Sequence, residues 1–491
     1  MEPKDISAIS RREFIRRAAC AAVGTAAMTS AIRDLRFMNA AVAQSNIGPN
    51  DYKALVCVFL QGGNDSNNLI IPTIPSEYNN YAAIRTSVLA IPQSSILTLD
   101  GYTDPAGHTF GLHPACPELK QLFMEGKLAT LFNTGTLVYP LTRTQYNTPG
   151  SIKPPQLFSH ADQVTQWQTS IPDQPPTTGW GGRCADLLNS VQPGAPISLS
   201  VSLAGANTFE VGNIISQYNV STSGAIALSG VSGARLAALT NILGLSYPNM
   251  QAQAYAGVGL HSIQSGGLLN TAITNTAGNA YWTNPFPNTV TNQVSGVKFS
   301  SSLAPQLQMI ARLIEAGKRA TANGGFGMKR QIFFCQVGGY DLHTGQTPGP
   351  GQTTIGAHAN LFAELSQCLY AFQRAMEQFE PLYPGISKSV TAFTSSDFGR
   401  TFPSNGQGSD HGWGSHHLIV GGAVNGAKTY GKFPTLAVNG PDDTNTGRWI
   451  PTTAIDQYFA TLATWFGVDA GNLATVFPNV GRFATNNLGF I

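Results

Sequence analysis

The chain has 491 residues, and 42% of them are apolar, which is enough for a sizeable core. Only 11% are charged, against about 25% in an average soluble protein. The first 43 residues carry a net charge of +3, which leaves −1 for the rest of a chain whose total is +2. A nearly neutral body without clustered Lys and Arg excludes a nucleic-acid footprint.

The N-terminal segment predicts export. Residues 10–16 (SRREFIR) resemble a twin-arginine motif, a weakly apolar run follows at 18–32, and Ala41-Val42-Ala43 suits signal peptidase. The run is too short and too rich in Ala, Gly and Thr for a stable membrane span. We therefore expect residues 1–43 to be a signal peptide read by the twin-arginine export machinery, and residues 44–491 to be periplasmic or secreted.

The cysteines predict neither a disulfide framework nor a thiolate metal site. Cys20 lies in the signal segment, and five others remain, none of them in a CxxC pair. Cys57 and Cys335 fall inside apolar strand-like runs, where a buried thiol is the ordinary explanation.

Continuous apolar runs predict buried parallel strands, in chain order, at 54–60, 128–132, 197–201, 331–337, 390–394 and 418–420. Helical patterns precede several of them, at 117–125, 303–316 and 357–379. This alternation predicts an α/β fold, a mostly parallel sheet covered by helices on both faces. Residues 203–302, rich in Gly, Ser, Asn and Thr, predict a loop-rich insertion that forms a lid or an accessory layer of loops and short helices.

Acidic and imidazole side chains follow the predicted strands. Asp65 follows the first, Asp341 and His343 follow the fourth, Asp397 follows the fifth, and His411 comes soon after. Ligands of open α/β sheets bind beyond the carboxyl ends of the strands, and this mixture of groups suits a divalent metal such as Zn²⁺ or Mn²⁺. The alternative is that the aspartates only cap helices or turns. The metal interpretation requires Asp65, Asp341 and Asp397 to converge.

The chain resembles the DUF1501 family, which is related to the alkaline phosphatase/sulfatase superfamily. The resemblance spans residues 51 to about 440 and is carried by these segments: 62–65 (GGND), 111–114 (GLHP), 159–163 (SHADQ), 179–180 (GW), 338–343 (GGYDLH), 396–401 (SDFGRT), 410–412 (DHG) and 421–422 (GG).

The resemblance implies an alkaline-phosphatase-like fold, metal ions and a hydroxyl nucleophile at a helix start. The metal ligands that it implies are Asp65, Asp341, His343, Asp397 and His411, with His416 or His417 as a substitute. Phe398 stands where the superfamily has a histidine, so one ion or two (Zn, Mn, Mg or Ca) remain open.

Ser159 is the favoured nucleophile, because a predicted helix at 159–169 would support an anion at its N-terminus. Its alternative role is an N-cap, and Thr142 and Thr144 compete with it. His160 would orient a leaving group, bind metal or be structural. Arg400 would clamp an anionic oxygen or pair with a neighbouring carboxylate.

These residues predict a metal-dependent hydrolase of phosphate or sulfate esters with a seryl intermediate. Ser159 is followed by His160-Ala161-Asp162 and lacks the C/S-x-P-x-R setting, which argues against formylglycine sulfatase chemistry. The substrate is a small-molecule or polymer ester. The alternative is a non-catalytic exported metal- or carbohydrate-binding protein on the same fold.

Overall fold

The computed structural model describes residues 47–48, 51–192, 194–226 and 228–491. The proposed signal peptide, with its twin-arginine motif and Cys20, lies outside these residues. Within them, no helix combines the length and the apolar character needed to cross a membrane.

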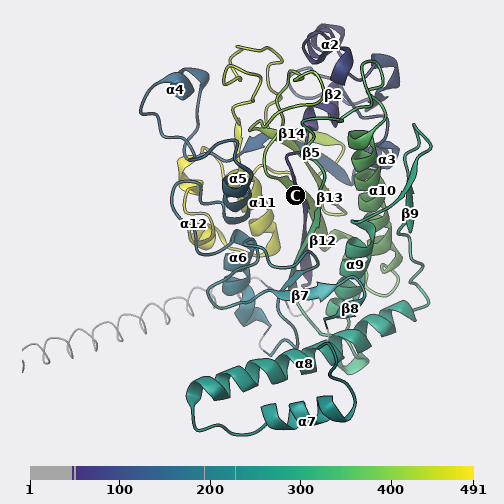
Figure 1. Cartoon of the computed structure of the whole chain (residues 1–491), viewed down its shortest axis with the longest axis vertical. Helices are drawn as coiled ribbons and strands as arrows, with labels where there is room; N and C mark the ends of the chain where they lie inside the picture. Colours follow the sequence, from purple (N-terminus) through teal and green to yellow (C-terminus); the bar gives the residue numbers. More distant parts are fainter. Residues whose placement is uncertain (1–46, 49–50, 193, 227) are drawn as a thin grey trace, which may run out of the picture.

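A ten-stranded sheet runs through the middle of the molecule (Figure 1). Its strands lie in the following order: β14 (Lys428–Tyr430), β5 (Leu128–Gly135), β13 (Ser415–Gly421), β12 (Val390–Ser396), β1 (Lys53–Leu60), β11 (Arg330–Val337), β6 (Ser200–Ser202), β7 (Tyr218–Ser221) and β8 (Gly224–Ala225), with β15 (Thr453–Ala454) beside β5. Central β1 has parallel neighbours on both sides, and every residue of it after Lys53 is buried. Burial on both faces explains why these strands read as continuous apolar runs.

Helices cover both faces of the sheet, as the alternating pattern predicts (Figure 1). One face carries α5 (His160–Thr169), α6 (Trp180–Leu188), α11 (Ile455–Phe466) and α12 (Leu473–Val476), and the other carries α3 (Pro117–Met124), α9 (Ala304–Lys318) and α10 (Ala357–Gln378). The chain therefore has the expected α/β fold with a mostly parallel sheet.

One strand differs from its prediction. β13 runs antiparallel to β12 and to β5, whereas its apolar run predicted a parallel strand. A parallel partner requires a crossover connection, usually a helix, and the chain between β12 and β13 contains no helix. The loop of residues 397–414 instead turns the chain back beside β12.

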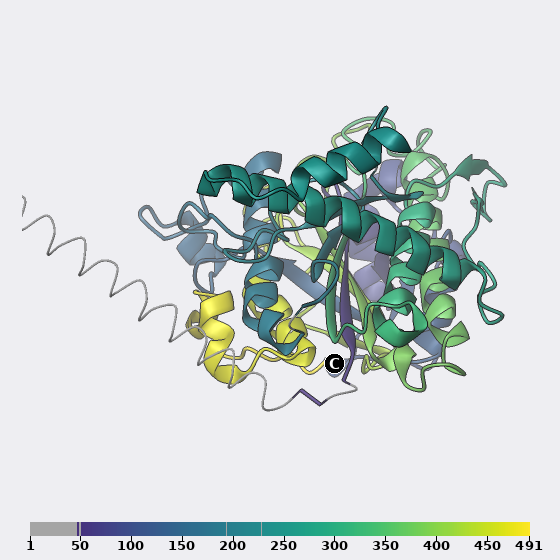
Figure 2. The same cartoon turned by 90° about the horizontal axis from the view of Figure 1, so that it is seen from below.

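The insertion at 203–302 differs in one respect. Beside the short α7 (Ala234–Leu243) it contains a long helix, α8 (Met250–Ala277), where only short helices are expected. Figure 2 shows them lying across one end of the molecule. Arg319, at the end of α9, donates to the carbonyl of Ala272 in α8, which places α8 near the amino end of β11. The helices therefore do not form a lid over the carboxyl ends of the strands. Few residues of α8 are buried, and most of them lie in its C-terminal half, so its sequence shows weak amphipathic periodicity.

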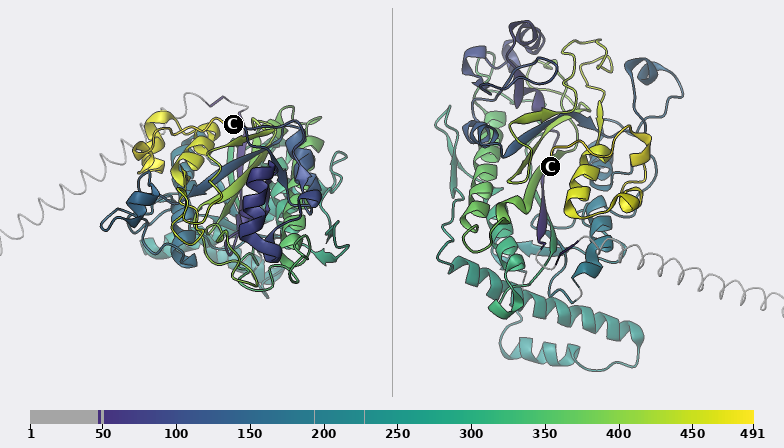
Figure 3. Two further views of the ribbon diagram at one scale, coloured as in Figure 1. Left: turned by 90° about the horizontal axis from the view of Figure 1, so that it is seen from above. Right: turned by 180° about the vertical axis from the view of Figure 1, so that it is seen from behind.

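The opposite end carries α2 (Pro75–Leu89) and a three-stranded sheet of β2 (Ile70–Pro72), β4 (Phe110–Leu112) and β3 (Leu97–Thr98), seen from above in Figure 3. This end collects the loops that follow the parallel strands. Leu60 of β1 lies opposite Val337 of β11 and Ser396 of β12, so three strands end at one level. Their following loops therefore start side by side.

Candidate metal centre

Three histidines and an aspartate meet at the carboxyl ends of β1, β11 and β12. Asp341 and His343 come from the loop after β11, and His411 comes from the returning loop after β12, where it bridges to Arg400. His160 is the first residue of α5. Residues widely separated in the chain thus supply one cluster.

The Nε2 atoms of the three imidazole rings point at one another. His411 Nε2 lies 2.9 Å from His343 Nε2 and 3.1 Å from His160 Nε2. The Asp341 carboxylate closes the group, with Oδ1 3.2 Å from His343 Nε2 and 3.4 Å from His411 Nε2, and with Oδ2 3.5 Å from His160 Nε2.

The opposite nitrogen of each ring faces an acceptor. Nδ1 of His160 lies 2.7 Å from Asp397 Oδ2, and Nδ1 of His343 lies 2.8 Å from Asp410 Oδ1. Nδ1 of His411 lies 2.7 Å from the carbonyl oxygen of Phe158. A carboxylate or carbonyl oxygen can only accept, so each Nδ1 carries the proton. In that tautomer, the Nε2 lone pairs of the three rings are directed at a common point.

Converging lone pairs about 3 Å apart repel one another unless a cation lies between them. A histidine that donates its outer N–H to a carboxylate or carbonyl while its other nitrogen faces inward has the usual arrangement of a metal ligand. Ligand atoms of His160, Asp341 and His411 all lie within 4.8 Å of one another. The donor set fits a single divalent cation held by imidazole nitrogen and carboxylate oxygen.

Two glycines in the loop after β1 allow that loop to lie close to the loops that follow β11 and β12. Gly62 has φ +115°, and a Cβ there would lie 2.4 Å from the backbone nitrogen of Asp341. Gly63 has φ +85°, and its Cβ would lie 2.4 Å from the Phe398 ring. Side chains at either position would push apart the loops that carry the cluster.

The charges around the cluster favour ionised Asp341 and neutral His411. Burial acts to raise the pKa of Asp341, but the hydrogen bond and charge of Arg400 outweigh it and lower the pKa. Partial burial lowers the pKa of His411, although its contact with the Phe158 carbonyl opposes the shift. Both shifts preserve the metal-binding form of the side chain.

The cluster is open to solvent on one side. The side chain of Asp341 is 46% exposed, and that of His411 is 24% exposed. A shallow cavity of about 450 Å³ adjoins the cluster, and its lining comprises Gln61, Gly62, His160, Ala161, Val164, Gly339, Asp341 and Asp397. On the buried side, the Phe398 ring packs 4.8 Å from His160 and 4.7 Å from His411. Structural metal sites are usually closed, whereas catalytic sites keep an open position.

A family model for proteins of unknown function, DUF1501, matches residues 52–471. The chain belongs to the DUF1501 family. No curated protein matches it. The segments that suggested DUF1501 from the sequence supply the cluster residues directly: SHADQ contains His160, GGYDLH contains Asp341 and His343, and DHG contains His411.

Four of the site residues predicted from the sequence lie together in the cluster, namely His160, Asp341, His343 and His411. Asp397 lies beside them but faces the outer nitrogen of His160, and its Oδ1 accepts the Gly62 N–H at 2.9 Å. Asp397 therefore orients the His160 ring and does not itself face the centre of the cluster.

Asp65 lies apart from the cluster, so the convergence of three aspartates that the metal interpretation required is not found. A metal site at this end of the sheet therefore depends on three histidines and Asp341 instead. Its carboxylate pairs with the buried guanidinium of Arg85 and accepts a hydrogen bond from Gln346. Burial acts to raise the pKa of Asp65, but the Arg85 charge and the Gln346 hydrogen bond contribute to a net lowering. Asp65 thus serves the fold through a buried ion pair, which differs from the capping role that the sequence left open, because its side chain makes no capping hydrogen bond.

His416 also has a different environment. Its Nδ1 accepts the backbone N–H of Asn133, and burial lowers its pKa to about 3. Its ring packs against Phe132 and Phe433. Neighbouring His417 packs against Trp167 in the core. Neither ring joins the cluster.

The two remaining predicted residues are engaged with the protein. The Ser159 hydroxyl donates to Asp162 at 2.6 Å. Arg400 is 1% exposed and donates to Asp341 Oδ1, to the carbonyl of Gly62 and to the carbonyl of Ser409. Arg400 therefore holds a cluster residue in place, which corresponds to the predicted carboxylate pair.

Sequence reasoning assigned no role to Asp410 or to the Phe158 carbonyl. Asp410 directly precedes His411 in the DHG segment, and this adjacency was the available signal. Nothing in the sequence points to a backbone carbonyl as a histidine partner.

Proposed function

We propose that this chain is an exported, metal-dependent hydrolase that binds one divalent cation through His160, His343, His411 and Asp341 and acts on phosphate or sulfate esters. The observation that carries the proposal is the inward convergence of three Nε2 lone pairs whose outer N–H groups all have acceptors.

The donor set favours Zn²⁺ or Mn²⁺ over Mg²⁺ or Ca²⁺, which prefer oxygen ligands. A divalent cation bound there would supply Lewis-acid chemistry, activating water and polarising an ester oxygen. Asp397 and Asp410 would keep two of the imidazoles in the tautomer and orientation that binding requires. Buried Phe398 fills the other side of the cluster, which supports one ion rather than two.

Arg448 supports an anionic substrate. Its Nε donates to the His411 carbonyl at 2.7 Å, and its guanidinium lies 4.2 Å from the centroid of the Phe158 ring. Within the described part of the chain, no carboxylate pairs with it. An unneutralised guanidinium beside a metal ligand suits the bidentate binding of a phosphate or sulfate group.

Water is a better candidate nucleophile than Ser159, because the Ser159 hydroxyl is already directed at Asp162. This replaces the seryl intermediate expected from the superfamily resemblance. Buried Phe398 in place of a ligand also favours the alternative, a non-catalytic metal- or carbohydrate-binding protein.

Metal content and turnover test the proposal. Wild-type protein and His261→Ala, a control on α8 at the other end of the molecule, should each hold one ion per chain, while His411→Ala should hold none. Wild type should hydrolyse at least one of p-nitrophenyl phosphate, bis-p-nitrophenyl phosphate and p-nitrophenyl sulfate. Arg448→Gln should raise KM for that ester about tenfold and keep the metal.

Two results would contradict the hydrolase. If His411→Ala keeps its ion, the cluster is not the metal site. If the wild type is loaded with metal and inert to all three esters, the binding alternative holds.

A further inference from the structure

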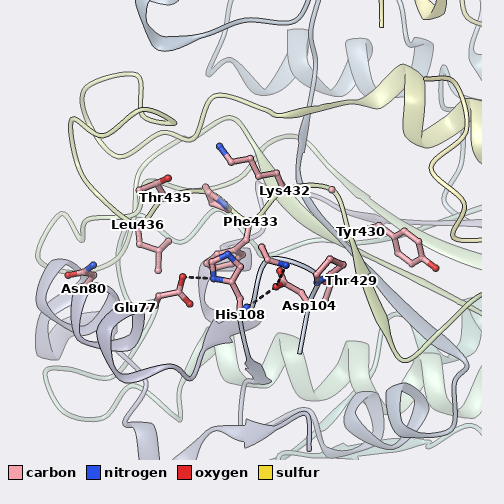
Figure 4. A pocket seen from close by; sticks show the side chains of 14 residues that line it. Glu77, Asn80, Asp104, His108, Thr429, Tyr430, Lys432, Phe433, Thr435 and Leu436 are labelled. Atoms are coloured by element: carbon pink, nitrogen blue, oxygen red, sulfur yellow. Dashed lines mark hydrogen bonds and ion pairs between the residues drawn. The ribbon is translucent and has the colours of Figure 1, made fainter. Parts of the chain in front are cut away.

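A second cavity, of about 630 Å³, lies away from the metal centre, and none of the four cluster residues lines it. Its walls come from the first turns of α2, the loop at 104–108, and β14 with the chain that follows it (Figure 4). The volume falls within the range of about 300–1,000 Å³ typical of small-ligand sites.

One wall offers a buried acceptor without a partner. Glu77 Oε1 lies 2.6 Å from His108 Nδ1, the contact drawn as a dashed line in Figure 4. Glu77 Oε2 is buried, and no hydrogen bond reaches it from the described residues. The Glu77 side chain as a whole is 24% exposed and lines the cavity, so its carboxylate group is an acceptor at this wall.

The neighbouring loop is held rigidly. Asp104 Oδ1 accepts the backbone N–H groups of Ala106 and His108, at 2.9 and 2.7 Å. These bonds close a tight turn that fixes His108, and with it Glu77, against the cavity. A pre-formed wall lowers the entropic cost of binding.

Donors line the cavity as well. Asn80, one turn after Glu77 on α2, offers an amide, and Lys432 offers an ammonium group. Lys432 Nζ lies 3.3 Å from Asp442 Oδ1, so its charge is partly balanced. Figure 4 shows Asn80 and Lys432 on different sides of the Glu77–His108 pair.

The floor is apolar and firmly packed. Phe433 is 7% exposed, and its ring contacts Phe110 and Phe132 edge-on at centroid distances of 4.9 and 5.0 Å. Buried Leu436 extends the floor. Hydrogen-bonding groups of both kinds thus surround an apolar base.

We propose that this cavity binds a neutral saccharide unit. A sugar presents an apolar ring face and a rim of hydroxyls, each of which both donates and accepts. It can donate to the carboxylates of Glu77 and Asp104 while accepting from Asn80 and Lys432. An organic cation would meet Lys432, and an anion would meet Glu77 and Asp104, so a neutral ligand avoids both conflicts. The site goes beyond the proposed hydrolase and does not depend on its metal.

Ligand-observed NMR and calorimetry on the full protein test the site with D-glucose, N-acetyl-D-glucosamine and their β-1,4-linked disaccharides. At least one should bind the wild type. Glu77→Ala should weaken that binding about tenfold or more, because a hydrogen bond to a charged group is lost. Asn80→Ala, at an exposed residue, should weaken it severalfold and guards against a folding defect in Glu77→Ala.

The matched control is Glu377→Ala. Glu377 and Glu77 have the same 24% side-chain exposure and both form ion pairs, but Glu377 does not line the cavity. The control should bind the sugar as the wild type does. The proposal is overturned if no saccharide binds, if propylamine or inorganic phosphate competes better than the sugars, or if Asn80→Ala binds as tightly as the control.

Discussion

Asp65 and Asp341 follow two neighbouring parallel strands, yet they have opposite environments. Asp65 is 2% exposed and is neutralised by Arg85, whereas the Asp341 side chain is 46% exposed and faces three imidazoles. The difference lies in what the rest of the chain brings to each: α2 carries Arg85 to the first, and α5 and the loop of residues 397–414 carry histidines to the second. A carboxylate at a strand end can thus serve the fold or bind a ligand, depending on its distant partners.

The largest effect is expected when the buried carboxylate of Asp65 is removed. Asp65→Ala leaves the buried Arg85 charge without its partner, so the free energy of unfolding should fall by about 3–5 kcal/mol. Urea unfolding of the metal-free protein measures the change. Asp173→Ala, which breaks the more exposed pair with Arg482, should cost at most about 1 kcal/mol. Equal losses of stability in the two variants would show that burial does not make the Asp65–Arg85 pair more important to the fold than an exposed pair.

Removing the exposed carboxylate of Asp341 should lower the affinity for metal and leave the stability of the metal-free fold nearly unchanged. Asp341→Ala should weaken binding of Zn²⁺ by more than about 100-fold, because losing a direct ligand exceeds the 10–100-fold effect of an outer partner. Metal competition titrations measure the affinity, and unfolding of the metal-free protein serves as the control. Unchanged affinity would show that Asp341 is not a ligand.

Asp397 and Asp410, which accept from the outer nitrogens of His160 and His343, should differ in how much each contributes to metal affinity. Asp397 is 1% exposed, whereas the Asp410 side chain is 47% exposed. Asp397→Asn should therefore weaken metal binding by about 10–100-fold, and Asp410→Asn should lie at or below the lower end of that range. A larger effect at Asp410 would contradict the ranking by burial.

The smallest expected effect is a change in the free energy of unfolding at acidic pH. The pKa of Asp65 is lowered in the folded protein, so its ionised form contributes stability above its unfolded value near 3.8. That contribution is lost as the pH falls through the folded pKa. The difference in unfolding free energy between wild type and Asp65→Asn should be constant from pH 7 to pH 5 and shrink below about pH 3.8. A gap that widens in acid would reverse the assigned sign.

The sequence predicts the sheet well, because buried strands leave continuous apolar runs. Predicted residues 331–337 and 390–394 correspond to β11 and β12, and predicted helix 357–379 corresponds to α10. Strand direction could not be predicted as well, because an apolar run has the same pattern in a parallel and an antiparallel strand. β13, predicted to be parallel, is antiparallel. Short helices were expected in the insertion, but the positions of α7 and α8 and the length of α8 could not be predicted, because both helices are nearly uncharged and only partly packed.

For the site, strand-end loops predicted the region but not the partner of each side chain. Asp341, His343 and His411 were selected as ligands, and the structure brings them together with His160, for which several roles were open. Asp65 could not be told from Asp341, because its partner Arg85 lies on a helix that carries no motif. Separating such cases requires knowing which residues meet across the fold.

The three histidines belong to chain segments that are far apart, and His160 and His411 are separated by 251 positions in residue number. An unfolded chain therefore has no ready-made chelator, and the cluster exists only when α5, the loop after β11 and the loop after β12 are all docked. A bound cation would act as a cross-link among these three pieces and favour the native state by mass action. Chelators and heat would then act together, since withdrawing the ion would remove this cross-link and lower the temperature at which the protein unfolds.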